Sequence, residues 1–354
     1  MTHYTRFPGW AAATLFALAS VSTLVGQTAY ISNSSSNNVS AINTATNTVI
    51  ATIPVGVHPV GVAVTLDGSR VYVVNQSANS VSVINTATNT VIATVPAGSE
   101  PTGVAVSGSA AYVTNVLSNT VSVISFATNT VIATVPVGDS PLGVISSPDG
   151  SKVYVFNYAG KSISVISTAT NAVTATLSIG FSAQCLAITP DGSKLYLANE
   201  NDLALSVFST VSNTVTATVP LGGFPVGVVL SLDSSKVYVS NLFGNNVSVI
   251  ATATNTVVAT VPVGTNPQGE ALTPDGTKVY VANSGSNNVS VISTATNAVI
   301  ATVPVGTAPL VFGNFIQPVV PGQSVPTLSE WAEITLALGL GVLALRAVKR
   351  TQAA

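Results

Sequence analysis

The chain has 354 residues, of which 47% are hydrophobic and only 6% are charged, and its formal net charge is −2. This hydrophobic content excludes a long disordered polar chain and indicates a packed structure. Lysine and arginine form no cluster outside the two ends of the chain. Since electrostatic binding of nucleic acid needs a dense basic surface, the sequence predicts no nucleic-acid partner.

Cysteine and histidine are almost absent, which limits the possible chemistry. The single cysteine, Cys185, excludes an intrachain disulfide and a Cys-x-x-Cys metal site. Apart from His3 near the start, the only histidine is His58. A zinc site built on several histidines is therefore excluded, and a Ser-His-Asp triad would have to include His58. We predict no cofactor.

Residues 1–27 are typical of a secretory signal peptide. Arg6 lies in a short polar start, and the apolar segment "WAAATLFALASVSTLVG" follows from Trp10 to Gly26. The alternative is a membrane anchor that is not cleaved.

A tyrosine followed three residues later by an asparagine recurs along the chain, at steps of 42, 40, 42, 42, 42 and 42 residues. A fixed period of this size indicates a repeat architecture. The pairs are Tyr30/Asn33, Tyr72/Asn75, Tyr112/Asn115, Tyr154/Asn157, Tyr196/Asn199, Tyr238/Asn241 and Tyr280/Asn283.

Each period contains four short runs separated by turn residues. In the copy after Asn266 the runs are "PQGEALT", "KVYVAN", "NVSVIST" and "AVIATVPVG". They are rich in β-branched residues and bounded by Gly, Pro, Asn or Asp, as β-strands are. Residues that tolerate positive φ mark the turns. These are the Asp-Gly pairs at Asp67, Asp149, Asp191 and Asp275, and the asparagines Asn47, Asn89, Asn129 and Asn255.

Four strands in each of seven periods predict an all-β fold, a seven-bladed β-propeller of four-stranded blades over residues 28–316. The chain enters at "TAYISN", a second strand without a first. It leaves at Ala308–Ile316, a first strand without a second. Pairing of these two segments would complete a blade and close the ring. The alternative is a β-solenoid, which would need caps.

The "YVTN" segment Tyr112–Asn115, with "YVVN", "YVAN" and "YVSN" in other copies, resembles the YVTN-type β-propeller repeats of bacterial and archaeal surface proteins. The resemblance covers about residues 28–316. It implies the propeller fold and a location at the cell surface, and it implies no particular activity.

Function is expected where the copies differ from one another. In a propeller, the loops from each fourth strand to the next first strand share a face with the loops from second to third strands. Here these loops hold most of the aromatic and charged residues that do not repeat. We predict that this face binds a protein or a glycan at the cell surface. The candidate residues are Tyr158, Phe181, Phe224, Leu242 and Phe243, with His58, Glu100 and Glu270.

Several of these loop residues have alternative interpretations. Phe181 and Phe224 would instead fill the mouth of the central channel. Glu200 and Asp202 in "NENDLA" are the nearest candidates for a calcium site, and the alternative is exposed loop charge. We therefore predict no metal site.

Two residues depart from the repeat within a predicted first strand. Glu270 stands where other copies have valine or leucine, which makes it a candidate functional carboxylate. The alternative is a carboxylate solvated by water in the channel. Cys185 replaces a repeated glycine, and we expect a small buried residue rather than a nucleophile.

The end of the chain differs in composition from the repeats. A linker and a short motif occupy residues 317–330, and residues 331–354 combine an apolar run with a basic tail. The apolar run is near the lower limit of length for a transmembrane helix, and its basic tail would remain in the cytoplasm. We predict a C-terminal transmembrane helix that holds the protein at the membrane before any processing.

The short motif resembles the "IPTL" C-terminal sorting signals of Gram-negative bacteria. Valine replaces the usual isoleucine at its first position. The resemblance implies export to the cell envelope, temporary anchoring and processing by an exosortase-like enzyme, and the alternative is a plain C-terminal anchor. The motif residues are Val325, Pro326, Thr327, Leu328, Glu330 and Trp331.

Three functions follow from these features. The first is a non-enzymatic binding or scaffold protein at the cell surface. The second is a propeller enzyme, a lactonase or oxidoreductase that uses the central channel, where His58, Glu100, Asp139 and Glu270 would have to converge. The third is a purely structural, surface-layer-like protein.

Overall fold

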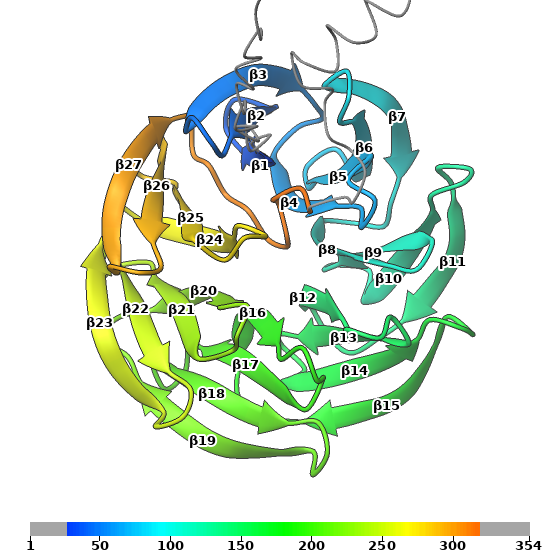
Figure 1. Ribbon diagram of the computed structural model, residues 1–354. Coiled ribbons are helices and arrows are strands. Elements are labelled where there is room, and N and C mark those ends of the chain that lie inside the picture. Colours follow the sequence, from blue (N-terminus) through cyan, green and yellow to red (C-terminus); the bar gives the residue numbers. More distant parts are fainter. Residues whose placement is uncertain (1–26, 319–354) are drawn as a thin grey trace, which may run out of the picture. The chain divides into compact units, whose positions relative to one another are not determined.

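The computed structural model describes residues 27–318, and within this range it contains 27 strands. The strands form seven antiparallel sheets arranged in a ring (Figure 1). The predicted seven-bladed β-propeller is therefore confirmed. Within the described range no helix has the length and hydrophobicity that a membrane crossing requires. Apart from Gln27, the predicted signal peptide lies outside that range, as do the sorting motif and the C-terminal helix.

We number the blades in chain order. Blade 1 is the three-stranded sheet β1–β3, and blades 2 to 7 are the four-stranded sheets β4–β7, β8–β11, β12–β15, β16–β19, β20–β23 and β24–β27. The innermost strands surround the axis of the ring. They are β4 (Pro59–Val64), β8 (Pro101–Ser107), β12 (Pro141–Ser146), β16 (Ala183–Ile188), β20 (Pro225–Leu230) and β24 (Pro267–Leu272).

The second strands end with the Tyr-x-x-Asn sequence, and they are buried apart from the first residue of most of them. They are β1 (Thr28–Asn33), β5 (Arg70–Asn75), β9 (Ala110–Asn115), β13 (Lys152–Asn157), β17 (Lys194–Asn199), β21 (Lys236–Asn241) and β25 (Lys278–Asn283). The third strands pair with them. They are β2 (Asn38–Asn43), β6 (Ser80–Asn85), β10 (Thr120–Ser125), β14 (Ser162–Ser167), β18 (Ala204–Ser209), β22 (Asn246–Ala251) and β26 (Asn288–Ser293).

The outer strands form the rim of the ring, and most of their residues are exposed or half-buried, apart from one buried residue near the end of most strands. They are β3 (Thr48–Pro54), β7 (Thr90–Pro96), β11 (Val131–Pro136), β15 (Ala172–Ser178), β19 (Thr214–Pro220), β23 (Thr256–Pro262) and β27 (Ala298–Pro304). No outer strand holds a charged residue. Their β-branched residues suit a pleated surface of which only one side is covered.

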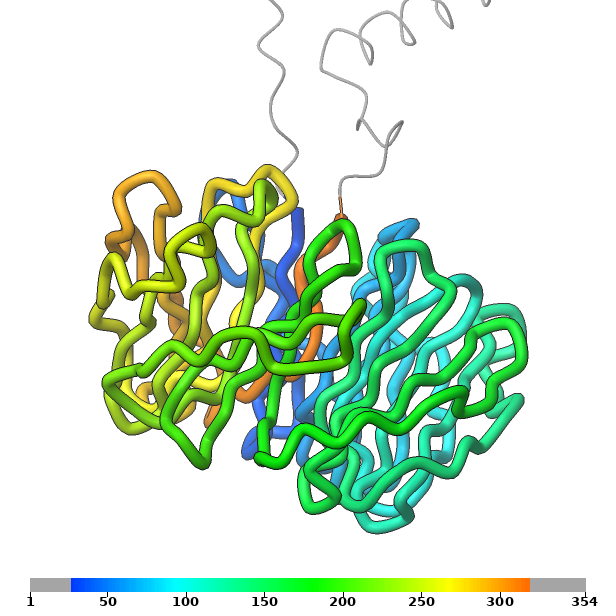
Figure 2. Tube along the Cα trace, turned by 90° about the horizontal axis from the view of Figure 1, so that it is seen from below, coloured from blue at the N-terminus to red at the C-terminus, as the bar shows by residue number. Residues whose placement is uncertain are grey.

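The C-terminal segment 308–316 closes the ring. It runs antiparallel beside β1, with bridges between Ala29 and Ile316 and between Asn33 and Pro309. The Tyr30 N–H donates to the Phe315 carbonyl at 2.8 Å. Figure 2 shows this orange segment beside the blue strand β1. The closure predicted from the sequence is therefore confirmed, and it removes the free inner edge of blade 1.

The repeated tyrosine and asparagine have separate structural roles. The asparagine holds its own blade together, since Asn75 Nδ2 donates to Ser82 Oγ of the third strand at 2.9 Å. The tyrosine links its blade to the next one. For example, the Tyr112 hydroxyl of blade 3 donates to Asn171 Oδ1 of blade 4 at 2.9 Å. The same contact joins Tyr30 to Asn89, Tyr72 to Asn129 and Tyr280 to Asn47. The period of the sequence is thus the period of these contacts.

Glycines of the innermost strands bring neighbouring blades together at the axis. A Cβ atom on Gly61 would overlap the Thr102 carbonyl of the next blade, and one on Gly103 would overlap the Leu142 carbonyl. These blades can therefore approach so closely only where the inner strand carries glycine.

The ring has two faces with different loops. We call "loop face" the segments equivalent to residues 76–79 and 97–100, and "turn face" the segments equivalent to residues 65–69 and 86–89. On the turn face, Gly68, Gly150, Gly192 and Gly276 have φ of 67°, 68°, 71° and 72°. The asparagines Asn47, Asn89, Asn129 and Asn255 have φ between 51° and 55°. Both sets of predicted turn residues are confirmed.

Replacing Phe315 by alanine tests the ring closure. Its side chain is fully buried at 0% exposure, so we expect Phe315→Ala to lower the free energy of unfolding by about 3–5 kcal/mol. Phe243→Ala is the matched control, because Phe243 is 71% exposed and should change stability by less than about 1 kcal/mol. Chemical denaturation of both variants measures the difference. Equal stability of the two variants would contradict the closure.

Candidate functional site

A repeated backbone contact forms the frame of the loop face. In five of the seven blades the residue before the first strand has positive φ, for example 56° at His58 and 48° at Glu100. Its N–H donates to an asparagine side chain of the preceding blade, at 3.0 Å from His58 to Asn37 and 2.9 Å from Glu100 to Asn79. The backbone of His58 and Glu100 is thus part of the frame. Glu100 is exposed and His58 is half-buried.

The frame changes in blades 5 and 6. Ser182 and Phe224 occupy the same loop position there, and neither has positive φ. The Ser182 N–H also donates to an asparagine side chain, Asn201 Oδ1 at 2.7 Å, but Asn201 belongs to the same blade as Ser182. The loop face is therefore least regular where the predicted aromatic residues lie.

An aromatic pair projects from blade 6. The rings of Phe224 and Phe243 are 5.6 Å apart between centroids and inclined by 53°. Phe243 is 71% exposed, while Phe224 is half-buried beneath it. Leu242 is half-buried beside them, and its N–H donates to the Phe224 carbonyl at 2.7 Å. The structure brings together three of the predicted residues.

Phe181 lies apart from this pair. It is only 8% exposed and belongs to the hydrophobic core with Phe156 and Leu197. This packing corresponds to the alternative in which Phe181 fills space inside the ring. Tyr158 is half-buried against the same core.

A buried carboxylate lies next to Tyr158. The Tyr158 hydroxyl donates to Glu200 Oε2 at 3.0 Å, and Glu200 is only 8% exposed. Burial raises the pKa of Glu200, and burial together with the Glu200 carboxylate raises the pKa of Tyr158. Within residues 27–318, Glu200 Oε1 has no hydrogen-bond partner. Glu200 is therefore not the exposed loop charge that the sequence also suggested.

Asp202 does not share the contacts of Glu200. Asn199 Nδ2 donates to Asp202 Oδ2 at 2.9 Å, so Asp202 supports the turn after β17. Among the described residues no three His, Cys, Asp or Glu side chains are placed to hold a metal ion. The four side chains that an enzymatic channel would need, including His58 and Glu270, thus form no such cluster.

Glu270 contacts the neighbouring blade rather than channel water. It is 7% exposed, Ser240 Oγ donates to its Oε2 at 2.7 Å, and the Ser240 N–H donates to its Oε1 at 3.1 Å. The carboxylate lies against Gly227, where a Cβ atom would overlap it. Burial raises the pKa of Glu270 to about 8, against the lowering effect of the Ser240 hydrogen bonds. The expectation of water solvation is therefore wrong.

Cys185 is half-buried on β16. Burial raises the pKa of its thiol, with further contributions from the charges of Glu270 and Glu200. A thiol in these surroundings stays protonated and is a poor nucleophile.

The sequence analysis missed two features. The first is Ser240, which binds Glu270 from a strand 30 residues away. The second is the role of the cations of the turn face. Lys278 Nζ donates to the Thr44 carbonyl of the next blade at 2.7 Å, Lys236 Nζ donates to the Thr294 carbonyl at 3.1 Å, and Arg70 contacts Phe126 in the same way. These cations join blades.

One known sequence family, the IPTL-CTERM motif, matches residues 323–350. The match includes the motif predicted at Val325–Trp331 and confirms the sorting motif. No curated protein matches the chain.

Solved structures share the propeller fold. Hydrazine synthase of Kuenenia stuttgartiensis has a TM-score of 0.71 and 25% identity, over 81% of this chain and 99% of that one. A protein of unknown function from Desulfotomaculum acetoxidans DSM 771 has a TM-score of 0.70 and 20% identity, over 80% and 99%. A proposed 6-phosphogluconolactonase from Bacteroides fragilis NCTC 9343 has a TM-score of 0.71 and 17% identity, over 82% and 98%. These similarities concern the fold.

The variant Glu270→Gln tests the buried carboxylate. The pKa of Glu270 rises from 4.5 in the unfolded chain to about 8 in the folded protein, so the folded state holds the proton more tightly. Stability from this residue is present below pH 4.5 and is lost as the pH rises toward 8. Relative to Glu270→Gln, we expect the free energy of unfolding to fall by up to about 1.4 kcal/mol per pH unit in this window.

Denaturant unfolding at several pH values measures this difference. Glu100→Gln is the control, because Glu100 is exposed and its replacement should leave the pH dependence unchanged. A pH dependence of Glu270→Gln that equals that of the unmodified protein would contradict the buried, neutral carboxyl group.

Proposed function

We propose that the protein is an exported β-propeller of the cell surface that binds a partner through its loop face and has no enzymatic activity. The sorting motif at residues 323–350 supports export to the envelope of a Gram-negative cell and processing by an exosortase-like system. The partner is a protein or a glycan at that surface.

The positions of the chain ends on the ring support this function. The Thr44 N–H donates to the Gln27 carbonyl at 2.8 Å, and Gln317 Nε2 donates to the Gly68 carbonyl at 2.8 Å. Both Thr44 and Gly68 lie in the turn face. The described chain therefore enters and leaves the ring on the turn face, and the loop face lies on the opposite side of the ring.

The observation that carries the proposal is the aromatic pair Phe224–Phe243 on that opposite face. An exposed phenylalanine supported by a second ring offers apolar area at low cost in side-chain entropy, as binding hot spots do. Most other blades carry small or polar residues at the position of Phe243, for example Ser77 and Asn201, whereas blade 3 carries the exposed Leu117. The pair is therefore not required by the repeat.

A second function, a structural protein of the cell surface, is favoured by the rim. Its outer strands are uncharged and expose Ile50, Ile132 and Ile300 at 52%, 57% and 53%. Unpaired strand edges without charges are suited to lateral contacts between molecules. Ordered arrays of the purified protein in electron micrographs, without binding of any soluble partner, would favour this second function.

The double variant Phe224→Ala/Phe243→Ala tests the first function. We expect its affinity for whole cells of the producing strain to fall about 30-fold or more, because truncation of even one hot-spot aromatic residue costs about 2 kcal/mol or more. Binding of fluorescently labelled protein to cells that lack their own copy of the gene measures the affinity. Val211→Ala is the control, since Val211 is 82% exposed on the turn face. Unchanged binding of the double variant would contradict the proposal.

A further inference from the structure

Leu203 of blade 5 departs from the repeat on the loop face. The equivalent residue of five other blades is an asparagine, for example Asn37. Leu203 keeps the backbone position of these asparagines. Its carbonyl accepts from the Leu221 N–H at 2.9 Å, as the Asn37 carbonyl accepts from the Val55 N–H at 3.1 Å. The change is therefore confined to the side chain.

This exchange of asparagine for leucine costs stability in two ways. Leu203 has φ of 49°, a left-handed backbone conformation that asparagine tolerates and that strains a leucine. The asparagines also accept a hydrogen bond from the next blade, as Asn37 does from the His58 N–H, whereas a leucine side chain accepts none. Phe224 stands at the position of His58 across this junction, so its N–H loses that acceptor.

The exchange adds an exposed apolar side chain beside the aromatic pair. Leu203 is 45% exposed and Phe243 is 71% exposed. We call Leu203, Phe224, Leu242 and Phe243 the apolar patch. Leu203 belongs to blade 5 and the other three residues belong to blade 6, so the patch spans the junction between the two blades. A strained residue that adds exposed apolar surface indicates selection for a contact rather than for stability.

The surroundings of the apolar patch resemble the rim of a protein interface. The next loop-face segments, residues 263–266 and 284–287, hold only valine, glycine, threonine, asparagine and serine. The exposed charged side chains Lys161 and Asp202 lie on the other side, in blades 4 and 5. An uncharged, aromatic centre within a polar rim is typical of interfaces between proteins.

The chemistry of the apolar patch favours an apolar side chain over a sugar. A sugar presents hydroxyl groups, which need hydrogen-bonding side chains around the aromatic ring. None of the four side chains of the patch donates or accepts a hydrogen bond. A sugar bound here would bury hydroxyl groups without partners, which is unfavourable. An aliphatic or aromatic side chain has no such groups, and its burial is favourable.

We propose that the partner of the loop face is a protein, and that one of its aliphatic or aromatic side chains is buried against Leu203 and Phe243. This inference rests on the proposed function, because it names the kind of partner that the loop face binds. The partner's surface is uncharged where it faces blades 6 and 7, because a buried charge without a counter-charge is unfavourable.

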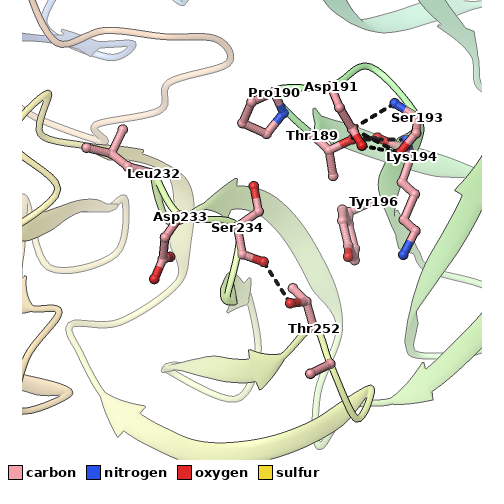
Figure 3. A pocket seen from close by; sticks show the side chains of 11 residues that line it. Thr189, Pro190, Asp191, Ser193, Lys194, Tyr196, Leu232, Asp233, Ser234 and Thr252 are labelled. Carbon is pink, nitrogen blue, oxygen red and sulfur yellow. Dashed lines mark hydrogen bonds between the residues drawn. The ribbon is translucent and has the colours of Figure 1, made fainter.

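A cleft on the turn face provides a control surface. It has a volume of about 540 Å³ and lies between blades 5 and 6, on the face opposite to the apolar patch (Figure 3). Some of its polar groups bond within their own blade, since Ser193 donates to Asp191 at 2.9 Å and the Thr252 hydroxyl donates to the Ser234 carbonyl at 2.7 Å. Ser234 stands where other blades have glycine. Lys194 lines the cleft and is exposed, so it can be replaced without affecting the patch.

The test uses the labelled full-length protein and cells that lack their own copy of the gene. One sample of cells is treated with proteinase K and another with sodium periodate, which oxidises the vicinal hydroxyl groups of sugars. We expect binding to be lost after proteinase K, because the protease removes the partner, and to be unchanged after periodate. Loss of binding after periodate, or binding that survives proteinase K, would overturn the inference and leave the proposed function standing.

Leu203→Asn restores the residue of the other blades and separates binding from stability. It should weaken binding to untreated cells about fivefold or more, because it removes an apolar contact beside the aromatic pair. It should also raise the Tm by about 2–4 °C, because it relieves the backbone strain and returns an acceptor to the Phe224 N–H. A purely structural role of Leu203 would not give these opposite effects.

Leu117→Asn is the matched control, since Leu117 is a leucine of the loop face in blade 3 and is 65% exposed. It should leave binding unchanged, as should Lys194→Ala on the turn face. Unchanged binding of Leu203→Asn, or an equal loss with Leu117→Asn, would overturn the inference. The proposed function itself fails in a different way, if Phe224→Ala/Phe243→Ala binds as well as the unmodified protein.

Discussion

The close approach of neighbouring inner strands is the constraint on which the ring depends. At Gly61, Gly103, Gly143 and Gly269, a backbone carbonyl of the neighbouring segment lies where the Cβ of another residue would stand. On the turn face of the junction at Gly103, Tyr112 donates to Asn171 of the next blade. The repeat consists of small and β-branched residues because larger ones would separate the blades.

The residues that depart from the repeat on the inner strands are concentrated in blades 5 to 7. Cys185 and Glu270 stand on inner strands, and the carboxylate of Glu270 fits only because Gly227 lacks a Cβ. The same blades carry the aromatic pair on one face and the polar cleft on the other. A repeat protein can thus keep most of its blades for stability and vary a few of them for binding.

The fold could be predicted from the sequence because its signals are periodic. The seven tyrosine–asparagine pairs gave the number of blades, and the unpaired segments at residues 28–33 and 308–316 indicated the closure. Side-chain directions in the loops could not be predicted in this way. The burial of Phe181 and the bond from Ser240 to Glu270 depend on how far one blade stands from the next. The departure at Ser234 could have been found from the sequence, because a comparison of the equivalent turns shows serine where other blades have glycine.

Hydrogen–deuterium exchange of individual strands tests the central claim most directly. If the inner-strand glycines hold the blades together, amides of β17 and β21 exchange faster than the equivalent amides of β5 and β9, and Cys185→Gly slows their exchange. Uniform exchange in all blades, or exchange that Cys185→Gly leaves unchanged, would contradict the account.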